Sequence, residues 1–128
     1  MKLFFSWEEN DGSISPICSS DFDNEDGISL LCCLLTDDGG QRFFETVSWL
    51  DEGMNRVKSV RKARVTHADW SRDAWGVELT MNHAKIYSLH DEDYFEILNI
   101  ESFEIALLKW RNFIQEESKI GATLELQI

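Results

Sequence analysis

The sequence predicts an α+β fold, in which a mostly antiparallel sheet of five to seven strands packs against two main helices. The strongest observation is a change of period between residues 75 and 114. Large apolar side chains occupy every second position in Trp75–Met81, which is the pattern of a strand with one buried face. Further along they recur at intervals of three or four residues, at Phe103, Leu107, Trp110 and Ile114. This second spacing predicts a helix that covers the preceding strands.

Short connections indicate how the strands of this region pair. Strands are expected at residues 75–81, 85–90 and 94–98, and the links between them are too short for the crossovers that parallel strands need. His90–Asp93 is expected to form the turn between the last two of these strands. The helix that follows should cover residues 101–117, and alternating apolar residues in Ala122–Ile128 predict a closing strand.

The N-terminal part of the chain predicts further strands. Lys2–Trp7 alternates in the same way, and Asp11-Gly12 favours a hairpin turn. Ser13–Cys18 is expected at a sheet edge, because Pro16 cannot donate a ladder hydrogen bond. Ile28–Thr36 is almost entirely apolar, which predicts a central strand or a strand covered on both faces.

A second helix is expected at residues 41–61. Its apolar stripe consists of Phe43, Val47, Leu50, Met54 and Val57. Gly53 lies within the stripe and costs about 1 kcal/mol relative to Ala, so a break or kink there is compatible with the pattern. Val65–Trp70 is expected to be a short strand. With 128 residues, the chain has the length of one domain, and we expect a single domain over residues 1–128.

The chain is strongly acidic, with 24 acids, 12 bases and a net charge of −12. Residues 1–55 contain only two bases, Lys2 and Arg42, whereas five bases gather in a basic island at residues 56–64. An acidic field repels nucleic acid and anionic membranes and accelerates association with a basic partner. We therefore expect no nucleic acid and no membrane among the partners. An acidic surface also serves solubility alone, so charge by itself does not establish a partner.

Composition also bears on location. No apolar run reaches the length of a membrane span, and the N-terminus lacks the sections of a signal peptide. Three Cys do not make a disulfide framework, and adjacent Cys32 and Cys33 would point to opposite faces of a strand as small apolar residues. These features predict a cytoplasmic protein.

No candidate catalytic or metal-binding motif in the chain has the residue spacing that such a site requires. Asp21–Gly27 superficially suggests a calcium loop, but Asp26 falls where the sharp-turn Gly is required and Cys32 where the bidentate Glu is required. The three Cys and the three His (His67, His83 and His90) lack the paired spacing of zinc ligands. No Gly-rich phosphate loop precedes a helix. We expect no metal, no cofactor and no catalytic residues; a small hydrolase or nuclease that uses one of the His residues is the less favoured alternative.

Two acidic segments are the candidate partner-binding surface. Each combines carboxylates with an aromatic side chain, a mixture suited to a basic protein surface. The first is an expected exposed loop with Phe22, and the second ends in Tyr94. The candidate contacts are Asp21, Asp23, Glu25, Asp26, Asp91, Glu92, Asp93 and Tyr94. Taken singly, each segment is also consistent with an ordinary solvated loop.

Part of the chain resembles a known family. The runs Ser48–Met54, Ala74–Leu79 and Asp91–Ile100, followed by the helical pattern that ends at Ile114, are similar to small immunity proteins of bacterial toxin systems. These include the immunity proteins of contact-dependent growth inhibition and of other polymorphic toxins. The likeness covers roughly residues 42–117. Many members have a Pro near the start of the last helix, where this chain has Ile100-Glu101.

The resemblance implies a protein without chemistry of its own, which binds one cognate toxin domain in the cytosol and blocks its active site or substrate surface. Such toxins are often nucleases with basic clefts, which an acidic inhibitor can occupy in place of a phosphate backbone. A regulatory or adaptor domain, which binds through an acidic surface or adds a partner strand to its C-terminal edge strand, remains an alternative.

Trp110 provides a test of the predicted core. Trp110→Ala removes a large side chain from the helix that should cover the strands, and should lower the free energy of unfolding by about 3–5 kcal/mol. Chemical denaturation measures this change. A denaturation midpoint equal to that of the wild type would contradict the core assignment.

Overall fold

The computed structural model describes residues 1–116 and 120–128, and it confirms the α+β class. The described elements follow one another in the order β1 (Lys2–Asn10), β2 (Ser13–Ser20), α1 (Leu30–Thr36), the 3₁₀ turn η1 (Phe43–Thr46), α2 (Val47–Arg61), β3 (His67–Ser71), β4 (Trp75–Thr80), β5 (His83–Ser88), β6 (Asp91–Asn99), α3 (Ile100–Gln115) and β7 (Thr123–Gln127). Among these elements, no helix is long and apolar enough to cross a membrane.

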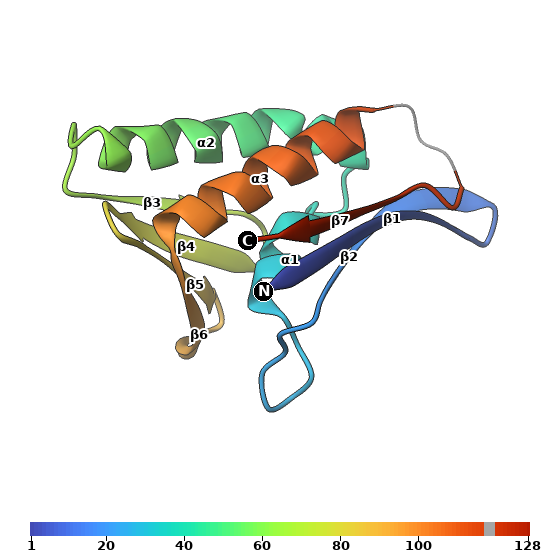
Figure 1. Cartoon of the computed structure of the whole chain (residues 1–128), viewed down its shortest axis with the longest axis horizontal. Coiled ribbons are helices and arrows are strands. Elements are labelled where there is room, and N and C mark those ends of the chain that lie inside the picture. Colours follow the sequence, from blue (N-terminus) through green and yellow to red (C-terminus); the bar gives the residue numbers. More distant parts are fainter. Residues whose placement is uncertain (117–119) are drawn as a thin grey trace.

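The strands form two antiparallel sheets. One has the strand order β2-β1-β7 and the other the order β3-β4-β5-β6. Figure 1 shows α2 and α3 side by side across the top of the molecule, with α1 between the two sheets and the chain termini close together. The N-terminal strand pairs with the C-terminal one, as in the register Leu3↔Leu126. Ser13–Cys18 does lie at a sheet edge, as Pro16 predicted.

The region from β4 to α3 has the predicted arrangement. Val77 and Leu79 of β4 point into the core together with the cross-strand residues Ala84 and Ile86. Above them, the predicted helical stripe of α3 is buried, with exposures of 0–2% at Phe103, Leu107, Trp110 and Ile114. The helix ends at Gln115, and residue 117, its predicted end, lies outside the described residues.

The C-terminal half of α3 joins the three-stranded sheet to the rest of the core. The Trp110 ring packs edge-on against Phe5 of β1, with 5.1 Å between the ring centroids. Phe113 stacks on Trp7 at 5.6 Å. One helix therefore buries its N-terminal half against β5 and β6 and its C-terminal half against β1.

The segment Ile28–Thr36 is a helix and not the strand that its apolar composition suggested. Ser29 is the N-cap, and its Oγ accepts a hydrogen bond from the Cys32 N–H at 3.3 Å. The helix is apolar on almost every side because α1 packs against β2 on one side and β4, β5 and β6 on the other. A buried helix of this length cannot be distinguished from a buried strand by periodicity.

The two adjacent cysteines therefore do not alternate across a strand. Both lie in α1, and Cys32 faces Cys18 of β2, whose Sγ donates a hydrogen bond to the Cys32 Sγ at 2.7 Å. This hydrogen bond, and to a smaller extent burial, raise the pKa of the Cys18 thiol. All three cysteines are free thiols.

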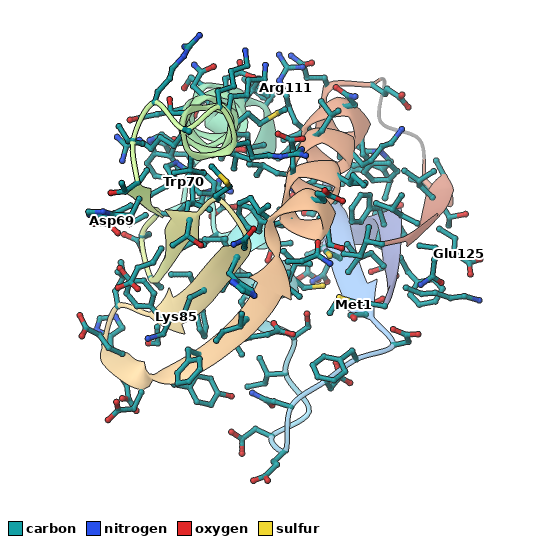
Figure 2. The ribbon with its side chains drawn as sticks, turned by 60° about the vertical axis from the view of Figure 1, so that its left-hand side comes forward. Met1, Asp69, Trp70, Lys85, Arg111 and Glu125 are labelled. Atoms are coloured by element: carbon teal, nitrogen blue, oxygen red, sulfur yellow. The ribbon has the colours of Figure 1, made fainter. Side chains whose placement is uncertain are left out.

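Helix α2 continues through Gly53 without a break. Residues 43–46 form the 3₁₀ turn, so the α-helix begins at Val47 and not at residue 41. Figure 2 shows Trp70 beneath α2, between this helix and the four-stranded sheet. A Cβ atom at Gly53 would lie 2.8 Å from Trp70 Cε2. Gly53 is required because the Trp70 ring lies directly against the helix backbone.

Gly53→Ala tests this close packing. Helix propensity alone would stabilise the variant by about 1 kcal/mol. We expect the opposite, a loss of about 1–3 kcal/mol in the free energy of unfolding, because the Trp70 ring or the helix must move. Thermal or chemical denaturation measures the sign. Ser48→Ala, at an exposed position of the same helix, is the control and should change stability by less than about 0.5 kcal/mol; a stabilised Gly53→Ala variant would contradict the packing.

Candidate functional site

The first predicted acidic segment is an exposed loop between β2 and α1. Asp21, Asp23, Glu25 and Asp26 are all exposed, as predicted. Asp21 is also tied to the start of β1, because its Oδ1 accepts a hydrogen bond from the Lys2 N–H at 2.8 Å. Figure 1 shows the loop extending from the molecule on the side away from α2 and α3.

The second acidic segment lies in a strand and not in the predicted turn. The turn consists of Leu89 and His90, and β6 begins at Asp91, which is paired with Ser88. A register shift at Tyr87/Ser88 marks the irregular start of this pairing. The irregularity explains why four polar residues suggested a longer turn. Asp91, Glu92 and Asp93 are exposed there, and Tyr94 is partly buried.

Tyr94 joins the two acidic segments, which are about 70 residues apart in sequence. Its hydroxyl accepts a hydrogen bond from Asn24 Nδ2 at 2.6 Å and donates one to Asp26 Oδ2 at 3.0 Å. The hydrogen bond from Asn24 lowers the pKa of the Tyr94 phenol. Partial desolvation and the hydrogen bond to Asp26 together raise this pKa by more, so the net shift is upward. The phenol therefore keeps the proton that it donates to Asp26 at neutral pH.

Asn24 organises the loop from within and was missed by sequence reasoning. Its Oδ1 accepts hydrogen bonds from the N–H groups of Asp26 and Ile28, at 2.9 and 3.0 Å. Its backbone carbonyl accepts from Gly27, which has a φ of +74°. The only signal in the sequence was an Asn followed three residues later by a Gly, a composition typical of many turns.

Glu96 attaches the strand to the helix that follows the loop. Its Oε2 accepts a hydrogen bond from the Leu31 N–H in the first turn of α1, at 3.2 Å. Burial raises the pKa of the Glu96 carboxyl, while the backbone N–H groups of Leu31 and Leu30 lower it to a smaller extent. A carboxylate at a helix N-terminus is electrostatically favourable, so Glu96 fixes the position of α1 relative to β6.

The loop and β6 together form one surface, which we call the acidic face: residues 21–26 and 91–97. Both segments contain several acids and no base. Two apolar side chains remain about half exposed on it, Phe22 at 54% and Ile97 at 53%, whereas Phe95 packs beneath Lys85, whose Nζ lies 4.6 Å from the ring centroid. Phe22 and Ile97 line a shallow hollow of about 340 Å³ between the loop and the strand. The acidic face thus combines apolar anchors with surrounding carboxylates.

The basic island at the end of α2 is partly neutralised by its neighbours. Arg61 pairs with Glu104 at 2.5 Å and with Glu101 at 3.6 Å, which connects α2 to α3. Arg56 pairs with Glu52 on its own helix and also donates to the Asp69 carbonyl. At these two positions the bases stabilise the helix layer.

The three His residues occupy separate exposed positions. His67 lies on β3, His83 on β5 and His90 in the turn before β6. Among the described residues, no carboxylate forms an ion pair with any of them. Within residues 1–116 and 120–128, no group of three or more His, Cys, Asp or Glu side chains is arranged to hold a metal ion.

Comparison of the chain with family models, with curated proteins and with solved structures finds no match. The resemblance to immunity proteins therefore stays a prediction that rests on the residues quoted above.

Tyr94→Phe tests the link within the acidic face. Loss of the hydroxyl should lower the free energy of unfolding by about 1 kcal/mol, because two hydrogen bonds are removed. It should also speed hydrogen exchange at the Asp26 and Ile28 amides, which Asn24 holds. Tyr87→Phe is the matched control, since no hydrogen bond of the Tyr87 hydroxyl is found within the described residues. Equal effects of the two substitutions would contradict the link.

Proposed function

We propose that this chain is an immunity protein, which binds a cognate toxin domain with a basic surface and occludes its active site or substrate cleft. The observation that carries the proposal is the acidic face, in which Tyr94 holds two acidic segments together around exposed apolar side chains. The toxins of such systems are often nucleases, and a nuclease cleft that binds phosphates would accept this surface.

The composition of the acidic face suits protein recognition. Stable interfaces combine aromatic and aliphatic anchors at the centre with a polar rim. Phe22 and Ile97 would supply the anchors and slow dissociation. The carboxylates would accelerate encounter with a basic partner and exclude acidic ones.

The internal bonds of the face favour binding by reducing its entropic cost. Asp21 and Asp26 are already held, by the Lys2 N–H and by the Tyr94 hydroxyl. Within the described residues, the side chains of a second group make no hydrogen bond or ion pair: Asp23, Glu25, Glu92 and Asp93. The first group fixes the loop, and the second remains available to bases of a partner.

In this proposal the protein acts in the cytosol, where the toxin would meet its target, and has no catalytic activity. The free thiols Cys18 and Cys32 are compatible with a reducing compartment.

An adaptor domain is the second candidate function, and the position of β7 favours it. Among the described strands, β7 pairs with β1 alone, so its outer edge could accept an extended peptide. In that case the partner would contact Thr123–Gln127, and the charge of the acidic face would have little effect on affinity.

Charge removal distinguishes these functions. The test co-expresses the chain with the product of the adjacent reading frame, where the proposal expects a toxin domain, and measures growth, complex formation and association rate. We expect the wild-type chain to restore growth. A variant with Asp23→Asn, Glu25→Gln, Glu92→Gln and Asp93→Asn should bind about 100-fold more weakly, with most of the loss in association rate at low salt.

The control variant removes four exposed acids elsewhere, Glu8→Gln, Glu9→Gln, Asp11→Asn and Glu45→Gln, and has the same net charge. It should bind within about threefold of the wild type. Equal losses for the two variants would show that only the overall field matters. Absence of a complex, with the toxin still lethal, would refute the immunity function.

A further inference from the structure

Arg72 is a buried arginine with no carboxylate partner among residues 1–116 and 120–128. It follows β3, is only 7% exposed, and lies between two indole rings, with its Cζ 5.3 Å from the Trp49 ring and 5.8 Å from the Trp70 ring. In the part of the chain that the structure describes, it forms no ion pair. Buried charges in proteins are nearly always paired, so this guanidinium requires an explanation.

The hydrogen bonds that Arg72 makes within the fold come from only one end of its side chain. Nη1 donates hydrogen bonds to the carbonyls of Leu34 and Leu35, at 3.2 and 3.1 Å, and so caps the C-terminus of α1. The buried Nε has no hydrogen-bond partner within the described residues. Nε is thus a charged donor without an acceptor among the described residues, but it is enclosed by protein atoms and offers no open edge for a paired hydrogen bond.

The nearby carboxylates are committed to other donors. Asp37 Oδ2 accepts hydrogen bonds from the N–H groups of Ala74 and Trp75, at 2.8 and 3.1 Å. Asp38 Oδ1 accepts one from the Gly40 N–H at 2.8 Å. Burial lowers the pKa of Arg72 to about 10 in spite of the opposing effect of these two acids, so the guanidinium remains charged at neutral pH.

Arg72 lies in the wall of a cleft of about 420 Å³, bounded by β2, the segment from α1 to η1, and the C-terminal half of α3. This volume is in the range of small-molecule sites. A second cation, Arg42, belongs to the same wall, although residues 1–55 contain only one other base. The rest of the wall includes one acid, Asp38, the amide of Gln41, several hydroxyls, and apolar and aromatic surface from Leu35, Phe43 and Ile114.

We propose that this cleft binds a small organic anion, with a carboxylate or phosphate group against Arg72 where it lines the cleft and an apolar or aromatic body against Phe43 and its apolar neighbours. Arg42 would add a second favourable charge, and the hydroxyl groups would accept or donate further hydrogen bonds. The site lies outside the acidic face, so it is independent of the proposed immunity function.

The experiment titrates the full chain with phenyl phosphate, benzoate and inorganic phosphate, using nitrogen-15 NMR of the Arg72 Nε–H group and the Trp indole N–H groups. We expect phenyl phosphate or benzoate to shift the Arg72 signal with a Kd below about 1 mM. Uncharged benzyl alcohol should bind at least about tenfold more weakly, because it cannot pair with the guanidinium. Shifts with inorganic phosphate alone would indicate an anion site without the apolar subsite and would overturn the proposal as stated.

Variants separate binding from folding. Arg72→Met should weaken binding by at least about tenfold, and Arg72→Lys should retain part of it, because an ammonium keeps the charge but not the planar fork. Arg42→Met, at an exposed position, should weaken binding severalfold even if Arg72→Met does not fold. Arg64→Met changes the net charge equally at an exposed position of the basic island and should bind as the wild type does. No shift of the Arg72 signal up to about 10 mM of any of the three anions, or unchanged binding in Arg42→Met and Arg72→Lys, would overturn the proposal.

Discussion

The fold depends on the aromatic contact between α3 and β1. The apolar faces of the two sheets must be buried against other elements, and α3 packs against both sheets, as α1 also does. Its C-terminal half reaches the three-stranded sheet through Trp110 on Phe5 and through Phe113 on Trp7. Its N-terminal half covers the four-stranded sheet. The space that remains between the sheets is filled by α1, which explains why that short helix is apolar on nearly every side.

The position of α1 in turn determines the surface on which the proposed function rests. The loop that enters α1 must leave β2 of one sheet and pass β6 of the other. Glu96 accepts a hydrogen bond from the first turn of α1, and Tyr94 bonds to Asn24 and Asp26 in the loop. Core packing therefore brings two acidic segments together, and the resulting face is partly preorganised for binding. The Arg72 cleft arises from the same helix, since Arg72 caps the C-terminal carbonyls of α1 and also lines the cleft.

Sequence reasoning was most successful where one face of an element meets solvent. The alternation in β4 and the helical spacing in α3 identified both elements because their buried residues recur with a regular period, although Ile105 and Leu108 of α3 are exposed. It failed for α1, where burial on all sides removes the periodic signal and only Ser29 marks a helix start. The division into two sheets also escaped prediction, because the pairing of Leu3 with Leu126 joins the ends of the chain and has no local signature.

In the functional surfaces, too, local patterns could be predicted from the sequence and long-range contacts could not. Each acidic segment was visible as a local charge cluster, but their contact through Tyr94 and Asn24 is a long-range property of the fold. Arg72 carried no signal at all, since a single base in a hairpin is unremarkable until its burial between Trp49 and Trp70 is known. The sequence suggested that Gly53 could break or kink α2. In the structure, the Trp70 ring lies against the helix backbone at Gly53.

The central claim is that the acidic face is the surface that a toxin domain covers. Hydrogen exchange of the backbone amides, compared between the free chain and its complex with the proposed toxin partner, tests it most directly. The account predicts that added protection is concentrated in residues 21–28 and 91–97. Protection centred instead on β7 or on the exposed side of α2, with the acidic face unchanged, would contradict it.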